Sequence, residues 1–163
     1  MSEKVVIGID PGSIVCGYGV LQSRGRNIIY ITSGDIRLPK TAPLPIRLKH
    51  LYEGLTEVVE MYKPDEAVIE KIFYSKGVTS ALNLGHARGV AMLCVSKVGI
   101  PVIEYSSLEV KKAVTGYGRA DKVQVMEMVK RILNKTDRLT QDSGDALALA
   151  LCHIQRCVFN LQQ

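Results

Sequence analysis

The sequence predicts a mixed α/β domain in which a five-stranded sheet carries helices on its faces. Three observations support this class: three β-branched runs follow one another closely at the N-terminus, two later strand patterns flank a helical one, and three helical patterns end the chain. The predicted element order is βββαβαβααα. With 163 residues, 47% of them hydrophobic, the chain can bury one good core, so we expect a single domain over residues 1–163.

The first three predicted strands are "KVVIGID" (4–10), "GYGVLQS" (17–23) and "NIIYITSGD" (27–35), with "SRGRN" as the turn between the last two. Because connections this short join antiparallel neighbours, we expect a three-strand antiparallel meander. The prolines of "IRLPKTAPLP" exclude a helix from the loop that follows. Apolar residues then recur at helical spacing over residues 46–62.

The second half of the predicted sheet comes from two strands joined by a helix. "AVIE" (67–70) follows a Pro-Asp turn, "VTSALNLGHARGVAMLCVSKVG" (78–99) has helical periodicity, and "PVIEY" (101–105) is a further strand. This strand-helix-strand order predicts a parallel crossover, which gives two parallel strands. Three helices complete the chain: one that begins after Ser106, one over residues 120–133, and a very apolar one over residues 142–159.

Composition also bears on cellular location. The N-terminus lacks the apolar core and cleavage site of a signal peptide, and no apolar stretch approaches the roughly 18 residues of a membrane span, so we expect a cytoplasmic protein without membrane contact. The four cysteines form no CxxC pair, which disfavours a disulfide scaffold and a zinc site. Cys152, His153 and Cys157 lie in a helical pattern, where thiols commonly pack.

Positive charge is concentrated in one segment. The net charge is +5, and residues 111–138 hold eight Lys or Arg against three acids, which accounts for the whole excess. Such a segment has the electrostatic footprint of a nucleic-acid binder, and a solvated helix face gives a weaker version of the same pattern. Nucleic acid is the partner class that this distribution favours.

Two acids stand at the ends of predicted strands. Asp10 ends "VVIGID" and Glu70 ends "AVIE", where an unpartnered buried carboxylate would be costly or protonated. Each has an ordinary structural explanation: Asp10 can cap or brace the turn "DPGS" (10–13), and Glu70 can be an exposed edge residue paired with Lys71. Acids at the carboxyl ends of two sheet strands also have the placement of an active site.

Asp142 and Asp145 lie three residues apart at the start of the last predicted helix, so they share one face of its first turn. Alone, they favour a capping role, because Asp-x-x-Asp before an apolar run imitates a capping box. Two features weaken that interpretation. Asp145 is shorter than the Glu or Gln that closes such a box, and "ALALAL" predicts a buried helix that can present its first turn to the strand ends.

The four acids together make a different case from any one of them. Two divalent ions about 4 Å apart need several oxygen ligands, and Mg²⁺ prefers carboxylate, water and phosphate oxygen. Asp10, Glu70, Asp142 and Asp145 can supply that set, and the basic segment can attract the phosphate partner. We therefore take these acids as candidate metal-binding and catalytic residues.

Four motifs resemble one known family over essentially the whole chain. "GIDPGSIVCGYGVL", "VIEKIFYSKGVTSALNLGHARGVA", "EVKKAVTGYGRADKVQV" and "DSGDALALALCH" occur in the order and spacing of the RuvC-type Holliday junction resolvases. Each motif alone is weak, because "GIDPG"-like strands also occur in actin-like ATPases. The ordered set of four is very specific.

The resemblance implies a ribonuclease H-like fold and a homodimer that acts in DNA recombination and repair. The implied reaction nicks two like-polarity strands of a four-way DNA junction and leaves 5′-phosphate and 3′-hydroxyl ends. The family's catalytic, metal-binding carboxylates fall on Asp10, Glu70, Asp142 and Asp145, and some members carry His at the place of Asp142. Helix 78–97, with its small residues, is the candidate dimer interface, although such residues equally suit packing against the sheet.

The same resemblance assigns DNA contacts, cofactors and partners. The family's aromatic residue near the crossover point falls on Phe73, and its DNA-binding lysines fall on Lys111 and Lys122. Lys112 and Arg119 add to the positive rim that draws in the strand. Two Mg²⁺ ions per active site are implied, which Mn²⁺ can replace, and a branch-migration complex is the implied protein partner.

Three other functions stay open on the residues alone. An actin-like ATPase half would share the "GIDPGS" strand, but such proteins need two halves, and this chain has one copy and no GxxxxGK[ST] motif. A nucleic-acid-binding module without catalysis would use only the basic segment. A related ribonuclease H-like nuclease acting on other branched or hybrid substrates would have the same charge distribution and carboxylates.

Overall fold

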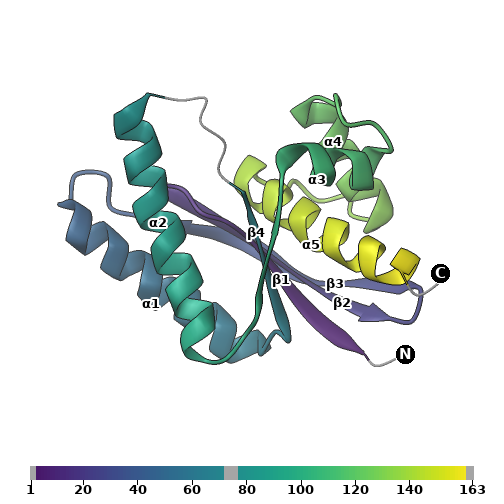
Figure 1. Cartoon of the computed structure of the whole chain (residues 1–163), viewed down its shortest axis with the longest axis horizontal. Coiled ribbons are helices and arrows are strands. Elements are labelled where there is room, and N and C mark those ends of the chain that lie inside the picture. Colours follow the sequence, from purple (N-terminus) through teal and green to yellow (C-terminus); the bar gives the residue numbers. More distant parts are fainter. Residues whose placement is uncertain (1–2, 72–76, 161–163) are drawn as a thin grey trace.

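A five-stranded mixed sheet runs through the centre of the computed structural model (Figure 1), which describes residues 3–71 and 77–160. The sheet has the order β3-β2-β1-β4-β5, in which β1 to β3 are antiparallel neighbours and β4 and β5 run parallel to β1. The predicted meander and parallel crossover are confirmed. The strands are β1 (Lys4–Asp10), β2 (Val15–Arg24), β3 (Asn27–Arg37), β4 (Glu66–Glu70) and β5 (Val102–Tyr105).

Helices cover both faces of the sheet (Figure 1). One face carries α1 (Leu44–Tyr62) and α2 (Val78–Lys97), and the other carries α5 (Gln141–Asn160), against which α3 (Ser107–Thr115) and α4 (Lys122–Ile132) pack. The predicted element order is confirmed. β2 and β3 are longer than predicted because their ladder continues to the pair Val15 and Arg37. Within the described ranges, no helix has the length and apolarity that a membrane crossing requires.

Strand alternation decides which side chains of β1 and β4 face α5. Val6 of β1 and Val68 of β4 are buried in the hydrophobic cluster that includes α5. Their neighbours in sequence belong instead to the cluster beneath α1 and α2, where Ile7, Ala67 and Ile69 are fully buried and Val5 is partly buried. Because residues two or four positions apart share a face, Asp10 lies on the α5 side with Val6, and Glu70 lies there with Val68.

Two glycines let α5 lie directly on the backbone of β1 and β2. A Cβ on Gly8 would overlap the carbonyl oxygen of Ala146, and a Cβ on Gly17 would overlap the carbonyl group of Asp142. Gly17 is also the β2 partner of Asp10 in the ladder. The close contact therefore places the first turn of α5 beside the end of β1.

Candidate active site

Acids from three elements meet at the carboxyl-terminal ends of β1 and β4. Asp10 ends β1, Glu70 ends β4, Asp145 lies near the start of α5, and all three line one cavity of about 130 Å³. β4 is an interior strand between β1 and β5. The alternative in which Glu70 is an exposed edge residue is therefore wrong.

The wall opposite the acids comes from α3 and α4. It carries two lysines, Lys111 and Lys122, next to the apolar side chains of Val110 and Val125. Apolar walls lower the local dielectric, so charges in the cavity act on one another more strongly than they would in water. The arrangement joins negative charge on the sheet and α5 with positive charge on α3 and α4.

Thr140 caps α5. The backbone N–H of Ser143 donates to Thr140 Oγ1 at 3.1 Å, as the N-cap position requires. Thr140 Oγ1 in turn donates to Asp35 Oδ1 of β3 at 2.7 Å, which ties the start of the helix to the sheet. The capping interpretation of Asp142 and Asp145 is therefore wrong, because the cap uses neither carboxylate.

Asp145 is held by donors from two helices. Gln141 Nε2 donates to Asp145 Oδ1 at 3.0 Å, and Lys122 Nζ lies 3.8 Å from Oδ2. Burial raises the pKa of Asp145, while Gln141 and Lys122 act in the opposite direction. Because the Lys122 side chain is 72% exposed, its ion pair is weak and can be exchanged for a metal ion or a phosphate group.

Asp10 has a strongly raised pKa. Burial, followed by the charges of Asp145, Glu70 and Asp142, raises the pKa of Asp10 from its ordinary 3.8 to about 7. Burial and the charge of Asp145 also raise the pKa of Glu70, against a hydrogen bond from Ser107. Asp142 does not line the cavity, but its charge reaches Asp10. A bound cation would relieve this repulsion.

The donor set fits a hard divalent cation that completes its shell with other oxygens. In the part of the chain that the structure describes, no group of three or more His, Cys, Asp or Glu side chains is placed to hold a metal ion by itself. Mg²⁺ is usually bound through one or two carboxylates plus water and substrate phosphate. An open set of carboxylates therefore suits Mg²⁺ better than it suits the closed shell of structural Zn²⁺.

The structure brings only some of the predicted DNA-binding residues to this site. Lys111 and Lys122 line the cavity, whereas Lys112 and Arg119 are exposed and do not. Lys112 instead borders a separate hollow between α3 and α5. Phe73 lies outside the described residues.

Two polar neighbours of the acids were missed from the sequence. Gln141 contacts Asp145 at helical i to i+4 spacing, so the spacing itself was a usable signal. Ser107 reaches Glu70 from another element, and nothing local in the sequence indicates that contact. Both residues contact a carboxylate, and both act to lower its pKa.

Comparisons with known proteins show the family to which the chain belongs. The family model described as "Crossover junction endodeoxyribonuclease RuvC" matches residues 6–153. A protein of that name from Geotalea uraniireducens is 44% identical over 155 residues, which cover 95% of this chain and 91% of the relative. Another, from Syntrophotalea carbinolica, is 47% identical over 148 residues, which cover 91% of this chain and 92% of the relative.

Solved structures give the same result. T. thermophilus RuvC in complex with a Holliday junction substrate is similar with a TM-score of 0.90, at 28% identity and over 96% of each chain. The yeast mitochondrial Holliday junction resolvase Ydc2 has a TM-score of 0.65 at 14% identity, covers 96% of this chain and 82% of its own, and shows the fold alone. The implied ribonuclease H-like fold is confirmed. The chain belongs to the RuvC family of crossover junction endodeoxyribonucleases.

Proposed function

We propose that this chain is a structure-selective endonuclease that resolves four-way DNA junctions by two symmetric, Mg²⁺-dependent nicks. The observation that carries the proposal is the cavity in which Asp10, Glu70 and Asp145 face Lys111 and Lys122. Carboxylates alone would repel a phosphodiester, and lysines alone would bind DNA without cutting it. The combination suits metal-assisted hydrolysis that leaves 5′-phosphate and 3′-hydroxyl ends.

Asp10, Glu70, Asp142 and Asp145 are the proposed metal-binding and catalytic residues. When bound, two Mg²⁺ ions, or Mn²⁺ in their place, lower the pKa of the attacking water and stabilise the leaving 3′ oxygen. Asp10, on which the charges of the other three acids act, would contribute to holding both ions, while Glu70 and the Asp142/Asp145 pair would each hold one. Because its pKa is raised to about 7, Asp10 must lose a proton before it can bind a cation.

The lysines of α3 and α4 handle the DNA strand in this proposal. Lys111 and Lys122 hold the scissile phosphate against the acids, and Lys122 exchanges its contact with Asp145 for the phosphate. Lys112 and Arg119 extend the positive surface away from the cavity and contribute salt-dependent affinity. Phe73 is proposed to stack on a base that is unpaired at the junction.

We also infer a homodimer built on α2. The exposed stripe of α2 has two exposed leucines, 59% and 60% exposed, on either side of two glycines with open space beside them. Its members are Leu82, Gly85, Gly89 and Leu93. Ala87 and Ala91 are buried, so packing within the fold explains why small residues stand at these two positions. Gly85 and Gly89 have open space beside them, so packing within the fold does not explain why they are small.

Apolar side chains around a Gly-x-x-x-Gly groove suit the close approach of a second copy about a two-fold axis. Such a dimer would present two identical active sites to one junction, which accounts for paired, symmetric nicks. The cytoplasm is the proposed location, and a branch-migration complex is the proposed protein partner.

One experiment tests the activity directly. The protein is incubated with Mg²⁺ and a fixed four-way junction, beside linear duplex, single strand and RNA–DNA hybrid, with EDTA as the control. We expect paired, ligatable nicks on the junction alone and no cleavage in EDTA. Cleavage of the hybrid in preference to the junction would indicate the related-nuclease alternative, and ATP hydrolysis without DNA would favour the ATPase one.

A further inference from the structure

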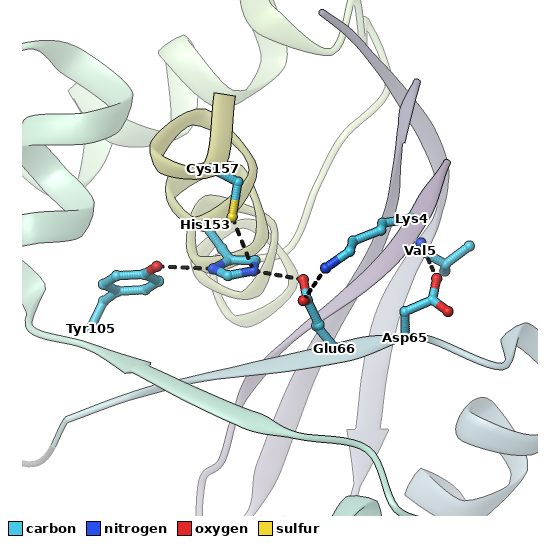
Figure 2. Close-up of polar contacts among 7 residues, drawn as sticks. All are labelled: Lys4, Val5, Asp65, Glu66, Tyr105, His153 and Cys157. Carbon is cyan, nitrogen blue, oxygen red and sulfur yellow. Dashed lines mark hydrogen bonds and ion pairs between the residues drawn. The ribbon is translucent and has the colours of Figure 1, made fainter. Parts of the chain in front are cut away.

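A second polar cluster joins β1, β4, β5 and α5 (Figure 2). His153 of α5 is only 6% exposed, and both of its ring nitrogens have a partner. Nδ1 lies 2.9 Å from Tyr105 Oη, and Nε2 lies 2.8 Å from Glu66 Oε2. Lys4 of β1 forms an ion pair with the other oxygen of Glu66, and Cys157 Sγ lies 3.6 Å from Nε2.

One assignment of protons satisfies this cluster. Burial raises the pKa of Tyr105 to about 12, so the phenol keeps its proton and donates to Nδ1. With Nδ1 as the acceptor, the Nε2–H of His153 donates to Glu66 Oε2. Burial acts to raise the pKa of Glu66, but the hydrogen bonds from Lys4 and His153 outweigh it and lower that pKa. Each buried polar group therefore has a partner.

The cluster and the active site lie at opposite ends of the same elements. The four residues from Glu66 to Glu70 span about 13 Å of strand, and the eight residues from Asp145 to His153 span about 12 Å of helix. Because α5 begins at the carboxyl ends of the strands, these two spans run in opposite directions beside each other. His153 thus meets Glu66 at one end when Asp145 faces Glu70 at the other.

We propose that His153 is a positioning residue for the catalytic carboxylates, because it fixes α5 along its axis relative to β4 and so sets Asp145 opposite Glu70. The inference rests on the proposed nuclease function. The glycine contacts of β1 and β2 set how closely α5 lies on the sheet. Hydrophobic burial is non-directional, whereas the hydrogen bonds of His153 at 2.8 and 2.9 Å are directional and restrain the position of α5 along its axis.

Tyr105 extends the same restraint to β5. It is the ladder partner of Glu70 in the β4–β5 pair, so its backbone is beside the catalytic strand end while its hydroxyl holds His153. One imidazole therefore connects the two parallel strands next to the site with the helix that carries Asp145.

The test separates positioning from stability. His153→Leu removes both hydrogen bonds and replaces the buried imidazole with an apolar side chain. At saturating protein and Mg²⁺, we expect the single-turnover rate of junction cleavage to fall about tenfold or more, because a displacement of about 1 Å can cost about 100-fold. Junction affinity without metal should stay within about twofold of wild type, because the lysines of α3 and α4 are unchanged.

Two further variants complete the design. Glu66→Gln keeps an oxygen acceptor for His153 and should retain a rate within about threefold of wild type. Tyr105→Phe keeps the aromatic ring and removes only the hydroxyl that contacts His153 Nδ1. This variant tests the positioning role of His153 if His153→Leu does not fold. We expect it to cleave more slowly than wild type at unchanged junction affinity.

The matched control is Val95→Ala on α2. Val95 is completely buried in the hydrophobic cluster on the opposite face of the sheet, so the substitution lowers stability without touching His153. All rates are measured well below the melting midpoints. Wild-type rates in His153→Leu or Tyr105→Phe, or an equal loss in Val95→Ala, would overturn the inference. A wild-type protein that cleaves no junction would instead refute the proposed function.

Discussion

Removing the charge of Asp10 should stabilise the protein while ending its activity. The pKa of Asp10 is raised from 3.8 to about 7, so between these pH values the folded state holds a proton that the unfolded state has lost. The contribution of Asp10 to the free energy of unfolding therefore falls by about 1.4 kcal/mol per pH unit between these two pH values. Above the higher value this contribution no longer changes with pH. Over about three pH units, the charge of Asp10 costs about 4 kcal/mol of stability.

Asp10→Asn keeps the shape of the side chain and removes this cost. At pH 8 in EDTA we expect the free energy of unfolding to rise by about 2 to 4 kcal/mol, or the melting midpoint by roughly 4 to 16 °C. Near pH 4.5 the wild-type carboxyl is protonated in the folded state, so the difference should shrink to about 1 kcal/mol. The variant should still bind the junction but not cut it.

Urea denaturation in EDTA at several pH values between 4.5 and 8 measures the effect. Glu53→Gln, an acid on α1 that is 53% exposed, is the control and should change the free energy of unfolding by less than about 0.5 kcal/mol. Mg²⁺ should stabilise wild type more than Asp10→Asn. A destabilised Asp10→Asn, or a stability gain that does not change with pH, would refute the reasoning.

Four more outcomes follow from the site and the α2 face. Glu70→Gln and Asp145→Asn should each slow cleavage by at least about 100-fold while junction binding in a gel-shift assay persists, because each removes the charge of a proposed metal ligand; retained cleavage would exclude that residue from catalysis. Lys122→Met should weaken junction binding and reduce the slope of log affinity against log salt by about one, as fluorescence anisotropy can measure. Leu82→Glu should shift the protein from dimer to monomer in sedimentation and uncouple the two nicks; an unchanged dimer would place the interface elsewhere. The Mg²⁺ concentration at half-maximal cleavage should rise about tenfold per pH unit below 7, because a proton competes for Asp10, and a flat profile would contradict its role.

The sequence predicted the strand-end acids because their placement depends on local rules. The strand patterns "VVIGID" and "AVIE" placed Asp10 and Glu70 at strand ends without knowledge of any distant contact. The parallel pairing of β1 with β4, which brings the two strand ends to one edge, was not predicted, because the predicted crossover joins β4 to β5. Periodicity and element order therefore gave the position of each carboxylate along its strand, and the structure gives their proximity.

The start of α5 was not predictable in the same way. Asp142 and Asp145 imitate a capping box in sequence, and the choice of Thr140 as the cap depends on its hydroxyl contact with Asp35, which is 105 residues away. His153 has the same difficulty, because Glu66 is 87 residues from it and Tyr105 is 48. Helical periodicity correctly predicted a buried position for His153 but carries no information on its partners.

The energetics of the acids explain why the fold restrains α5 at several places. An Asp10 charge that costs about 4 kcal/mol is a large fraction of the 5 to 15 kcal/mol by which domains are typically stable. Burial is the larger cause of that cost, and the repulsion by Asp145, Glu70 and Asp142 that adds to it acts to push the first turn of α5 away from β1 when no cation is bound. The opposing restraints lie outside the cavity: the glycine contacts at Gly8 and Gly17, the Thr140 cap on Asp35, and the His153 cluster. Because none of these groups lines the cavity, the acids can be held together without neutralising the charge that a metal ion needs.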